Sequence, residues 1–151
     1  MKIKFTHTNI IAKDWEKLSW FYQEVFECVP VPPKRDLQGN WIDQLTGIRG
    51  AHIRGEHLCL PGYENSLPTL EIFSYDDWVD GGLPQINRTG LGHLAFEVDD
   101  LDKMLKKVLA AGGGQIGERI VADYPNQVVA TFVYATDPEG NIVELQNWGT
   151  R

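Results

Sequence analysis

Apolar residues recur along this chain with two different spacings, and the wider spacing predicts two helices. The clearer stripe has apolar residues at positions i, i+3, i+4 and i+7, namely Leu101, Met104, Leu105 and Val108. Such a stripe is typical of an amphipathic helix that buries one face. Asp99 or Asp100 can cap its first turn, and the glycines at 112–114 end it.

An earlier segment carries a comparable stripe, which consists of Trp15, Leu18, Tyr22 and Val25. Asp14 precedes this stripe and Pro30 closes the region, as expected at the two ends of a helix. We therefore expect one helix near the beginning of each half of the chain.

Runs of β-branched and aromatic residues predict strands on both sides of each helix. A short strand that begins near a histidine precedes each helix. The later strands are expected at 41–45, 51–60 and 69–75 in the first half, and at 115–121, 128–135 and 141–146 in the second. Turn sequences such as "DPEGN" separate these runs, and "PPKRDLQGN" is expected to be a long connection. Each half is therefore predicted to have the order β-α-β-β-β.

The two halves are related by an internal repeat. "FTHTNIIAKDWEKL" aligns with "LGHLAFEVDDLDKM", and the offset of 86 (93 − 7 = 86) places His93 over His7. The halves also end alike, in "TLEIFSY" and "IVELQNW". The predicted organisation is a single domain, 1–151, with modules 1–75 and 91–151 joined by a linker, 76–90.

The repeat places four ionisable residues at corresponding positions, which are His7, Glu71, His93 and Glu144. Strand alternation turns each glutamate away from its apolar neighbours, so it faces the concave side of the sheet if those neighbours pack under a helix. An ionised carboxylate in an enclosed cavity is costly unless it is paired or bound to a metal. Each residue alone has an ordinary surface explanation, but two histidines and two carboxylates together suit a divalent transition metal.

Composition excludes some classes of function. The net charge of −7 argues against nucleic acid as the main partner, because phosphate binding is chiefly electrostatic. The sequence contains no apolar run near the roughly 18 residues that a membrane span needs and no signal peptide, so we expect a cytoplasmic protein without a membrane partner. The two cysteines, Cys28 and Cys59, match no metal or redox motif and are expected to be buried apolar residues.

Four segments resemble the vicinal oxygen chelate (glyoxalase / bleomycin resistance / dioxygenase) superfamily, which includes glyoxalase I and methylmalonyl-CoA epimerase. They are "HTNIIAKDWEKLSWFYQEVF", "LEIFSY", "GLGHLAFEVDDLD" and "ATDPEGNIVELQNW". The resemblance implies an α+β glyoxalase-like fold in which tandem βαβββ modules form a cupped, partly open mixed β-barrel around a metal. It also implies a homodimer, sometimes with modules exchanged between chains.

The resemblance further implies a ligand set, since the metal-dependent isomerases of this family carry ligands on the first and fourth strands of each module. Carried onto this sequence, the metal ligands are His7, Glu71, His93 and Glu144. One divalent ion per site is implied, which is nickel, zinc, cobalt or manganese, with iron less favoured. Four ligands on a six-coordinate ion leave two positions, which suits a small-molecule substrate with two adjacent oxygens.

The activity implied by the resemblance is that of a metal-dependent isomerase, epimerase or lyase, similar to lactoylglutathione lyase or to the epimerase. In this reaction Glu144 or Glu71 would abstract a proton next to a carbonyl, and the metal would stabilise the resulting enediolate. The stretch after His7 lacks the arginine that holds glutathione in glutathione-dependent glyoxalase I, so glutathione is not expected to be the cosubstrate.

Five further residues are candidates for substrate binding: Asn9, Arg54, His57, Phe73 and Trp148. Each also has an ordinary explanation, because strand ends and edges expose polar residues and aromatic residues usually pack in a core. Two other functions stay open. The first is a small-molecule binding protein of the antibiotic-sequestering type with the same fold. The second is an iron-dependent extradiol dioxygenase, which usually lacks a ligand on the strand equivalent to that of Glu71.

Overall fold

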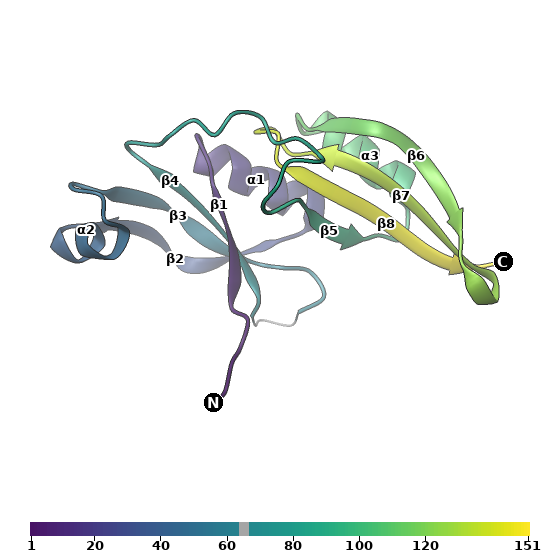
Figure 1. Cartoon of the computed structure of the whole chain (residues 1–151), viewed down its shortest axis with the longest axis horizontal. Helices are drawn as coiled ribbons and strands as arrows, with labels where there is room; N and C mark the ends of the chain where they lie inside the picture. The colour runs from purple at the N-terminus through teal and green to yellow at the C-terminus, as the bar shows by residue number, and fades with distance from the viewer. Residues whose placement is uncertain (64–66) are drawn as a thin grey trace. The chain divides into compact units, whose positions relative to one another are not determined.

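The computed structural model describes residues 1–63 and 67–151, and the chain divides into two compact units (Figure 1). The first unit comprises Met1–Asp80 and the second comprises Gly81–Arg151. Each unit has its own four-stranded sheet and its own long helix. Residues 76–90, all of them described, contain no helix or strand.

The first unit contains a mixed sheet with the strand order β1-β4-β3-β2. Its elements are β1 (His7–Ile11), α1 (Trp15–Phe26), β2 (Val29–Gln38), α2 (Asn40–Thr46), β3 (His52–Cys59) and β4 (Thr69–Tyr75). β1 pairs in parallel with β4, whereas the other pairs are antiparallel.

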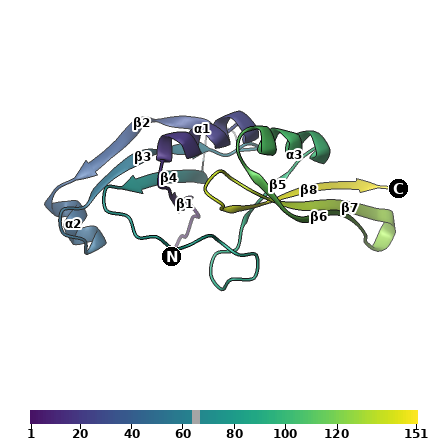
Figure 2. The same cartoon turned by 90° about the horizontal axis from the view of Figure 1, so that it is seen from above.

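The core of this unit lies between α1 and one face of the sheet. α1 packs against β3 and β4 and buries the stripe formed by Leu18, Phe21, Tyr22 and Val25. The sheet contributes Leu58, Leu70 and Ile72, which are all 0% exposed. Figure 2 shows α1 lying along this face. The helix begins where the sequence predicted, because the Asp14 side chain accepts a hydrogen bond from the Lys17 backbone N at 3.0 Å.

The second unit repeats this order, with a mixed sheet arranged β5-β8-β7-β6. Its elements are β5 (Leu94–Glu97), α3 (Leu101–Ala110), β6 (Gly114–Asp123), a 3-10 helix (Pro125–Gln127), β7 (Val128–Thr136) and β8 (Ile142–Thr150). β5 is parallel to β8, and the remaining pairs are antiparallel, as in the first unit.

α3 covers one face of the second sheet and packs against β6, β7 and β8. Val108 on the helix and Val143 and Leu145 on β8 are buried between them. The cap of α3 is Asp100, whose side chain accepts from the Lys103 backbone N at 2.9 Å. The α+β class and the tandem βαβββ order are therefore confirmed. The described strands form two separate four-stranded sheets and no closed barrel.

Two predictions about local structure in the first half are wrong. Residues 41–45 form a helix and not a strand, since α2 occupies Asn40–Thr46 between two glycines that have positive φ, Gly39 and Gly47. The second strand instead lies at Val29–Gln38, in the segment that was expected to be a connection. Prolines are tolerated there because β2 is an edge strand, and the register shifts between Val31 and Arg35 where two of them lie.

None of the helices in the described ranges is long and apolar enough to cross a membrane.

Candidate metal centre

Glu71 occupies the middle of a polar cluster on the sheet face that α1 leaves uncovered. It lies on β4 directly between Asn9 on β1 and His57 on β3. Its chain neighbours, Leu70 and Ile72, point to the opposite face and are fully buried there. Strand alternation therefore fixes which face the carboxylate occupies.

Three side chains surround the Glu71 carboxylate, whose side chain is only 13% exposed. Asn9 donates from Nδ2 to Oε1 at 2.9 Å. His57 Nε2 lies 2.7 Å from Oε2, and His7 Nε2 lies 3.7 Å from Oε1. The carboxylate is thus removed from water and held by polar groups on both of its oxygens.

The His57 imidazole is fixed by several neighbours. Its Nδ1 lies 3.1 Å from the Thr69 Oγ1, and its ring makes edge contacts with His7 and Phe73 at centroid distances of 5.6 and 6.0 Å. Burial lowers the pKa of His57, the Glu71 charge opposes that shift, and the nearby Arg35 and His7 side chains add to it. A neutral imidazole keeps a lone pair that can bind a metal.

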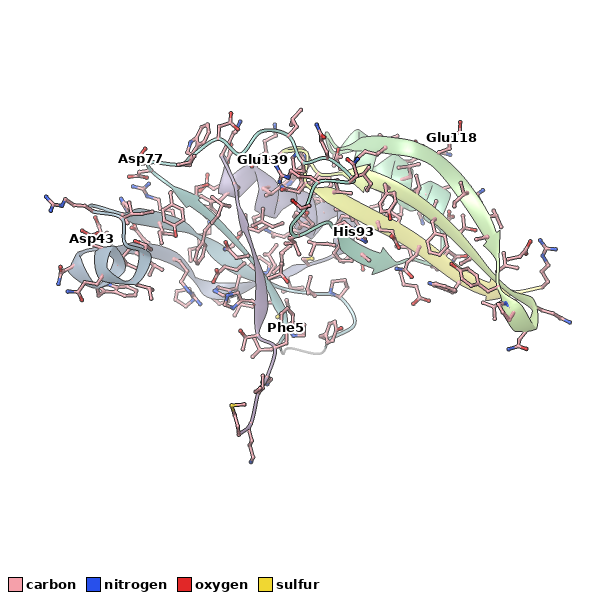
Figure 3. The ribbon with its side chains drawn as sticks, in the orientation of Figure 1. Phe5, Asp43, Asp77, His93, Glu118 and Glu139 are labelled. Atoms are coloured by element: carbon pink, nitrogen blue, oxygen red, sulfur yellow. The ribbon has the colours of Figure 1, made fainter. Side chains whose placement is uncertain are left out.

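The second unit holds an equivalent pair. His93 immediately precedes β5 (Figure 3), and β5 pairs Ala95 with Glu144. His93 therefore stands two residues before the partner of the glutamate, as His7 stands two residues before Asn9. Its Nε2 lies 3.3 Å from the Glu144 Oε2.

Tyr134 is the second unit's counterpart of His57, because it lies opposite Glu144 on the adjacent strand β7. Its ring meets His93 edge-on at a centroid distance of 5.3 Å. Burial raises the pKa of Tyr134, and the charge of Glu144 and a hydrogen bond to that carboxylate raise it further. The phenol therefore stays protonated and acts as a donor to Glu144.

A chain of hydrogen bonds connects Trp148 to the same glutamate. Trp148 Nε1 donates to the Gln146 Oε1, and Gln146 Nε2 donates to the Glu144 Oε1 at 3.2 Å. The indole ring also contacts Tyr124 and Phe132 at centroid distances of 5.2 and 5.5 Å. Trp148 nevertheless remains 40% exposed, so part of its surface is open to a ligand.

Both histidine–glutamate pairs fit a divalent metal in chemistry, and the pair of the second unit also fits in spacing. Two atoms bound at about 2.1 Å to one ion lie about 3.0–3.4 Å apart for bond angles near 90–109°. The distance from the histidine Nε2 to the nearer carboxylate oxygen is 3.7 Å in the first unit and 3.3 Å in the second. Imidazole nitrogen with carboxylate oxygen is a donor set that several first-row ions accept.

The structure brings most of the predicted first-unit residues together, but it does not bring Arg54 to them. His7, Asn9, His57 and Glu71 form the cluster. Arg54 pairs with Ser74 on β4 and thus lies on the opposite face of the sheet from His57. Its guanidinium donates to the Asp76 carboxylate and contacts the His52 ring there.

The other predicted residues lie on the same faces as their glutamates. Phe73 shares the face of Glu71, where it contacts His57 and also packs against the cluster of Ile42, Ala51 and Ile53 that α2 helps to form. Trp148 shares the face of Glu144, since it stands four residues further along β8.

Sequence reasoning missed Tyr134, Gln146 and Arg35. Gln146 could have been found by alternation, since it stands two residues after Glu144. Tyr134 lies opposite Glu144 only because of the register between β7 and β8, which the sequence pattern does not specify. Arg35 was assigned to a loop, whereas it pairs with Gly55 on the face of the cluster.

Comparison with known proteins supports the fold described above. The profile of the Glyoxalase/Bleomycin resistance protein/Dioxygenase superfamily matches residues 4–145. A glyoxalase family protein from Bacillus cereus is similar in structure, with a TM-score of 0.73 and 18% sequence identity, over 98% of this chain and 94% of that chain. No curated protein matches the chain.

A second neighbour is the genomically encoded fosfomycin resistance protein FosX from Listeria monocytogenes. It gives a TM-score of 0.59 at 17% identity, over 100% of this chain and 94% of that chain. The same protein in complex with Mn(II) and sulfate gives a TM-score of 0.55 at 18% identity, over 99% of this chain and 95% of that chain. At identities this low, the structural similarity shows a shared fold and nothing more.

Proposed function

Because the chain belongs to the Glyoxalase/Bleomycin resistance protein/Dioxygenase superfamily, we propose that it is a metal-dependent isomerase, epimerase or lyase. Its substrate is a small molecule with two adjacent oxygens, one of them a carbonyl. The observation that carries the proposal is the repeated histidine–glutamate pair at equivalent register positions of the two sheets. A chance surface pair has no reason to recur at the same place in both units.

The proposed metal ligands are the members of the two histidine–glutamate pairs, His7 with Glu71 and His93 with Glu144. Nickel, zinc, cobalt and manganese all accept this donor set. The Mn(II) complex of the fosfomycin resistance protein supports a divalent ion in a related fold. When bound, such an ion supplies Lewis-acid polarisation of a substrate carbonyl.

The base that removes the proton next to the carbonyl is proposed to be a glutamate. Glu71 is held by short contacts on both oxygens, at 2.7 and 2.9 Å. The contacts of Glu144 with His93 and Gln146 are longer, at 3.3 and 3.2 Å. Tyr134 also donates to Glu144, but the distances of Glu144 to His93 and Gln146 are longer than those of Glu71 to its neighbours, so Glu144 is the favoured base and Glu71 the more closely held ligand.

Four of the side chains beside these pairs are proposed to bind the substrate. Asn9 and His57 offer hydrogen-bonding groups next to Glu71, and Phe73 and Trp148 offer aromatic surface on the faces of the two glutamates. Arg54 is not included, because it lies on the other face of its sheet. The protein is further proposed to be a homodimer, which size-exclusion chromatography with light scattering tests.

The first experiment is elemental analysis of protein purified without a tag or added metal. We expect about one equivalent of a divalent transition metal per chain. NMR in D2O would then follow deuterium entering the α-carbon of α-hydroxy carbonyl and acyl-thioester compounds. Exchange should require the metal, and it should be lost in Glu144→Gln while the metal remains bound.

Other outcomes point to the other functions. A protein that neither contains nor accepts a metal would contradict the proposal and leave a metal-free binding protein as the better interpretation. Iron with oxygen uptake on catechols would favour the dioxygenase. If deuterium exchange continued unchanged in Glu144→Gln but stopped in Glu71→Gln, Glu71 would be the base in place of Glu144.

A further inference from the structure

We propose that Arg35 binds an anionic oxygen group of the substrate, such as a carboxylate. The substrate class is then a small molecule that carries this group a few atoms away from its two adjacent oxygens. The inference rests on the proposed function and keeps its metal ligands, because it concerns the substrate alone. It gives a role to a residue of β2 on the sheet face that carries Glu71.

Strand register places Arg35 on the same face as Glu71. Arg35 pairs with Gly55, which stands two residues before His57 on β3, and His57 pairs in turn with Glu71. Residues two apart on a strand share a face. Two strand spacings of about 4.8 Å and a step of two residues, about 6.6 Å, separate the backbone of Arg35 from that of Glu71. This distance leaves room for a small molecule between the guanidinium and the carboxylate.

The half-buried Arg35 side chain has donors to spare. Its guanidinium donates to the Pro33 carbonyl oxygen, so it leans back along β2 toward the row of His57 and Glu71. A guanidinium has five N–H donors, and a single acceptor leaves most of them available. Within the described part of the chain, no ion pair involves Arg35. The adjacent Asp36 faces the other way, where it pairs with His52.

An aromatic ring covers the ground between Arg35 and Glu71. Gly55 pairs with Arg35 on one side and with Phe73 on the other. A Cβ atom at Gly55 would lie 2.5 Å from Phe73 Cδ1, so the phenylalanine ring lies over the glycine backbone. The same ring meets His57 edge-on at a centroid distance of 6.0 Å. A molecule with its oxygens near Glu71 and an anionic group at Arg35 therefore lays its carbon chain across Phe73.

The chemistry of this end of the face favours an anion. The guanidinium fork can donate two parallel hydrogen bonds to one carboxylate. Because the whole chain has a net charge of −7, an anionic substrate needs a local positive group in order to bind. Burial is the main cause of the lowered pKa of His57, and Arg35 adds to it, as expected for a cation close to the imidazole. The positive charge thus stands beside the polar cluster.

The test uses two hydroxamates that offer the same pair of chelating oxygens. Succinohydroxamate ends in a carboxylate, whereas butyrohydroxamate, of similar length, ends in a methyl group. Each is titrated into the Co(II)-loaded full-length protein and followed by calorimetry and visible absorption. The wild-type protein should bind succinohydroxamate about 10–100-fold more tightly, the range expected for a charge-assisted hydrogen bond. Arg35→Ala should make the two affinities nearly equal.

Two further variants make the test specific to Arg35. Arg35→Lys should keep part of the preference, since lysine retains the charge but loses the fork. Arg54→Ala is the matched control and should keep all of it, because this arginine lies on the other face of the sheet. An unchanged affinity of Arg35→Ala for butyrohydroxamate shows that the variant is folded and that its chelating site is intact.

The outcomes separate this inference from the proposed function. Equal affinities for the two hydroxamates in the wild-type protein would overturn the inference and leave the proposed function standing, because the chelating group still binds. A preference that survives in Arg35→Ala would also overturn it. If the protein bound no Co(II), or if the loaded protein bound neither hydroxamate, both proposals would fail.

Discussion

In the first unit Glu71 lies between Asn9 and His57, whereas in the second unit Glu144 lies between Ala95 and Tyr134. The two sheets have the same strand order, and in each a histidine stands two residues before the strand partner of the glutamate. The repeat has therefore kept the position of the histidine–glutamate pair and changed the residues beside it. Those neighbours determine how each carboxylate is held, and they make the two halves chemically different.

The largest effect is expected in the two cores, where the units should behave alike. Ile72 and Leu145 occupy corresponding positions beside the two glutamates, and both are 0% exposed. Ile72→Ala and Leu145→Ala should each lower the free energy of unfolding by about 2–5 kcal/mol, through lost burial and the cavity left behind. Urea denaturation measures this. Leu45→Ala, at a position 74% exposed, is the control and should change little. A clear loss of unfolding free energy at only one of the two positions would contradict the equivalence of the two cores.

The next effect should separate the two carboxylates. Glu71→Ala is expected to weaken Co(II) binding by about 100-fold, because it removes the proposed ligand that Asn9 and His57 hold in place. Glu144→Ala removes the less closely held ligand and should weaken it by about 10-fold, which is about 1.4 kcal/mol. Calorimetric titration measures both, with the exposed Glu118→Ala on β6 as the control. Equal losses would indicate that both pairs contribute equally to one ion.

The smallest effect is expected at the helix caps. Asp14→Ala and Asp100→Ala each remove the acceptor for a backbone N–H in the first turn, and each should cost about 0.5–2 kcal/mol of stability. Asp14→Asn and Asp100→Asn should recover most of that loss, since asparagine also caps well. Thermal unfolding compares the four variants. If the Asp14 and Asp100 variants lost clearly different amounts of stability, the two caps would not stabilise their helices equally.

Much of this fold could be predicted because local patterns and tertiary packing agree. The stripe from Leu101 to Val108 and the aspartates before both helices correctly located α3 and α1. Alternation in "TLEIFSY" correctly turned Leu70 and Ile72 toward the helix and Glu71 away from it. The first half was harder, because the prolines of β2 disguise an edge strand, and two glycines bound a short helix that was expected to be a strand.

The candidate site shows the same division between local and non-local information. The four repeated residues were visible in the sequence because they fall at fixed offsets. That Arg54 and His57 lie on opposite faces follows from their odd spacing in one strand, so this error could have been avoided. The contacts of Glu71 with His57 and of Glu144 with Tyr134 depend on strand register, which is set by turns and packing across the sheet.

The prolines of β2 also bear on how the protein resists aggregation. An edge strand exposes unpaired backbone groups to which a strand from another molecule can add. Pro30, Pro32 and Pro33 have no backbone N–H to offer, so this edge of the first sheet is a poor template for growth. β6, the corresponding edge of the second sheet, has no proline and carries the exposed Ile120 and Val121. Its protection depends instead on the charges of Glu118 and Arg119 and on the irregular register beside them, so the second sheet is where self-association would begin.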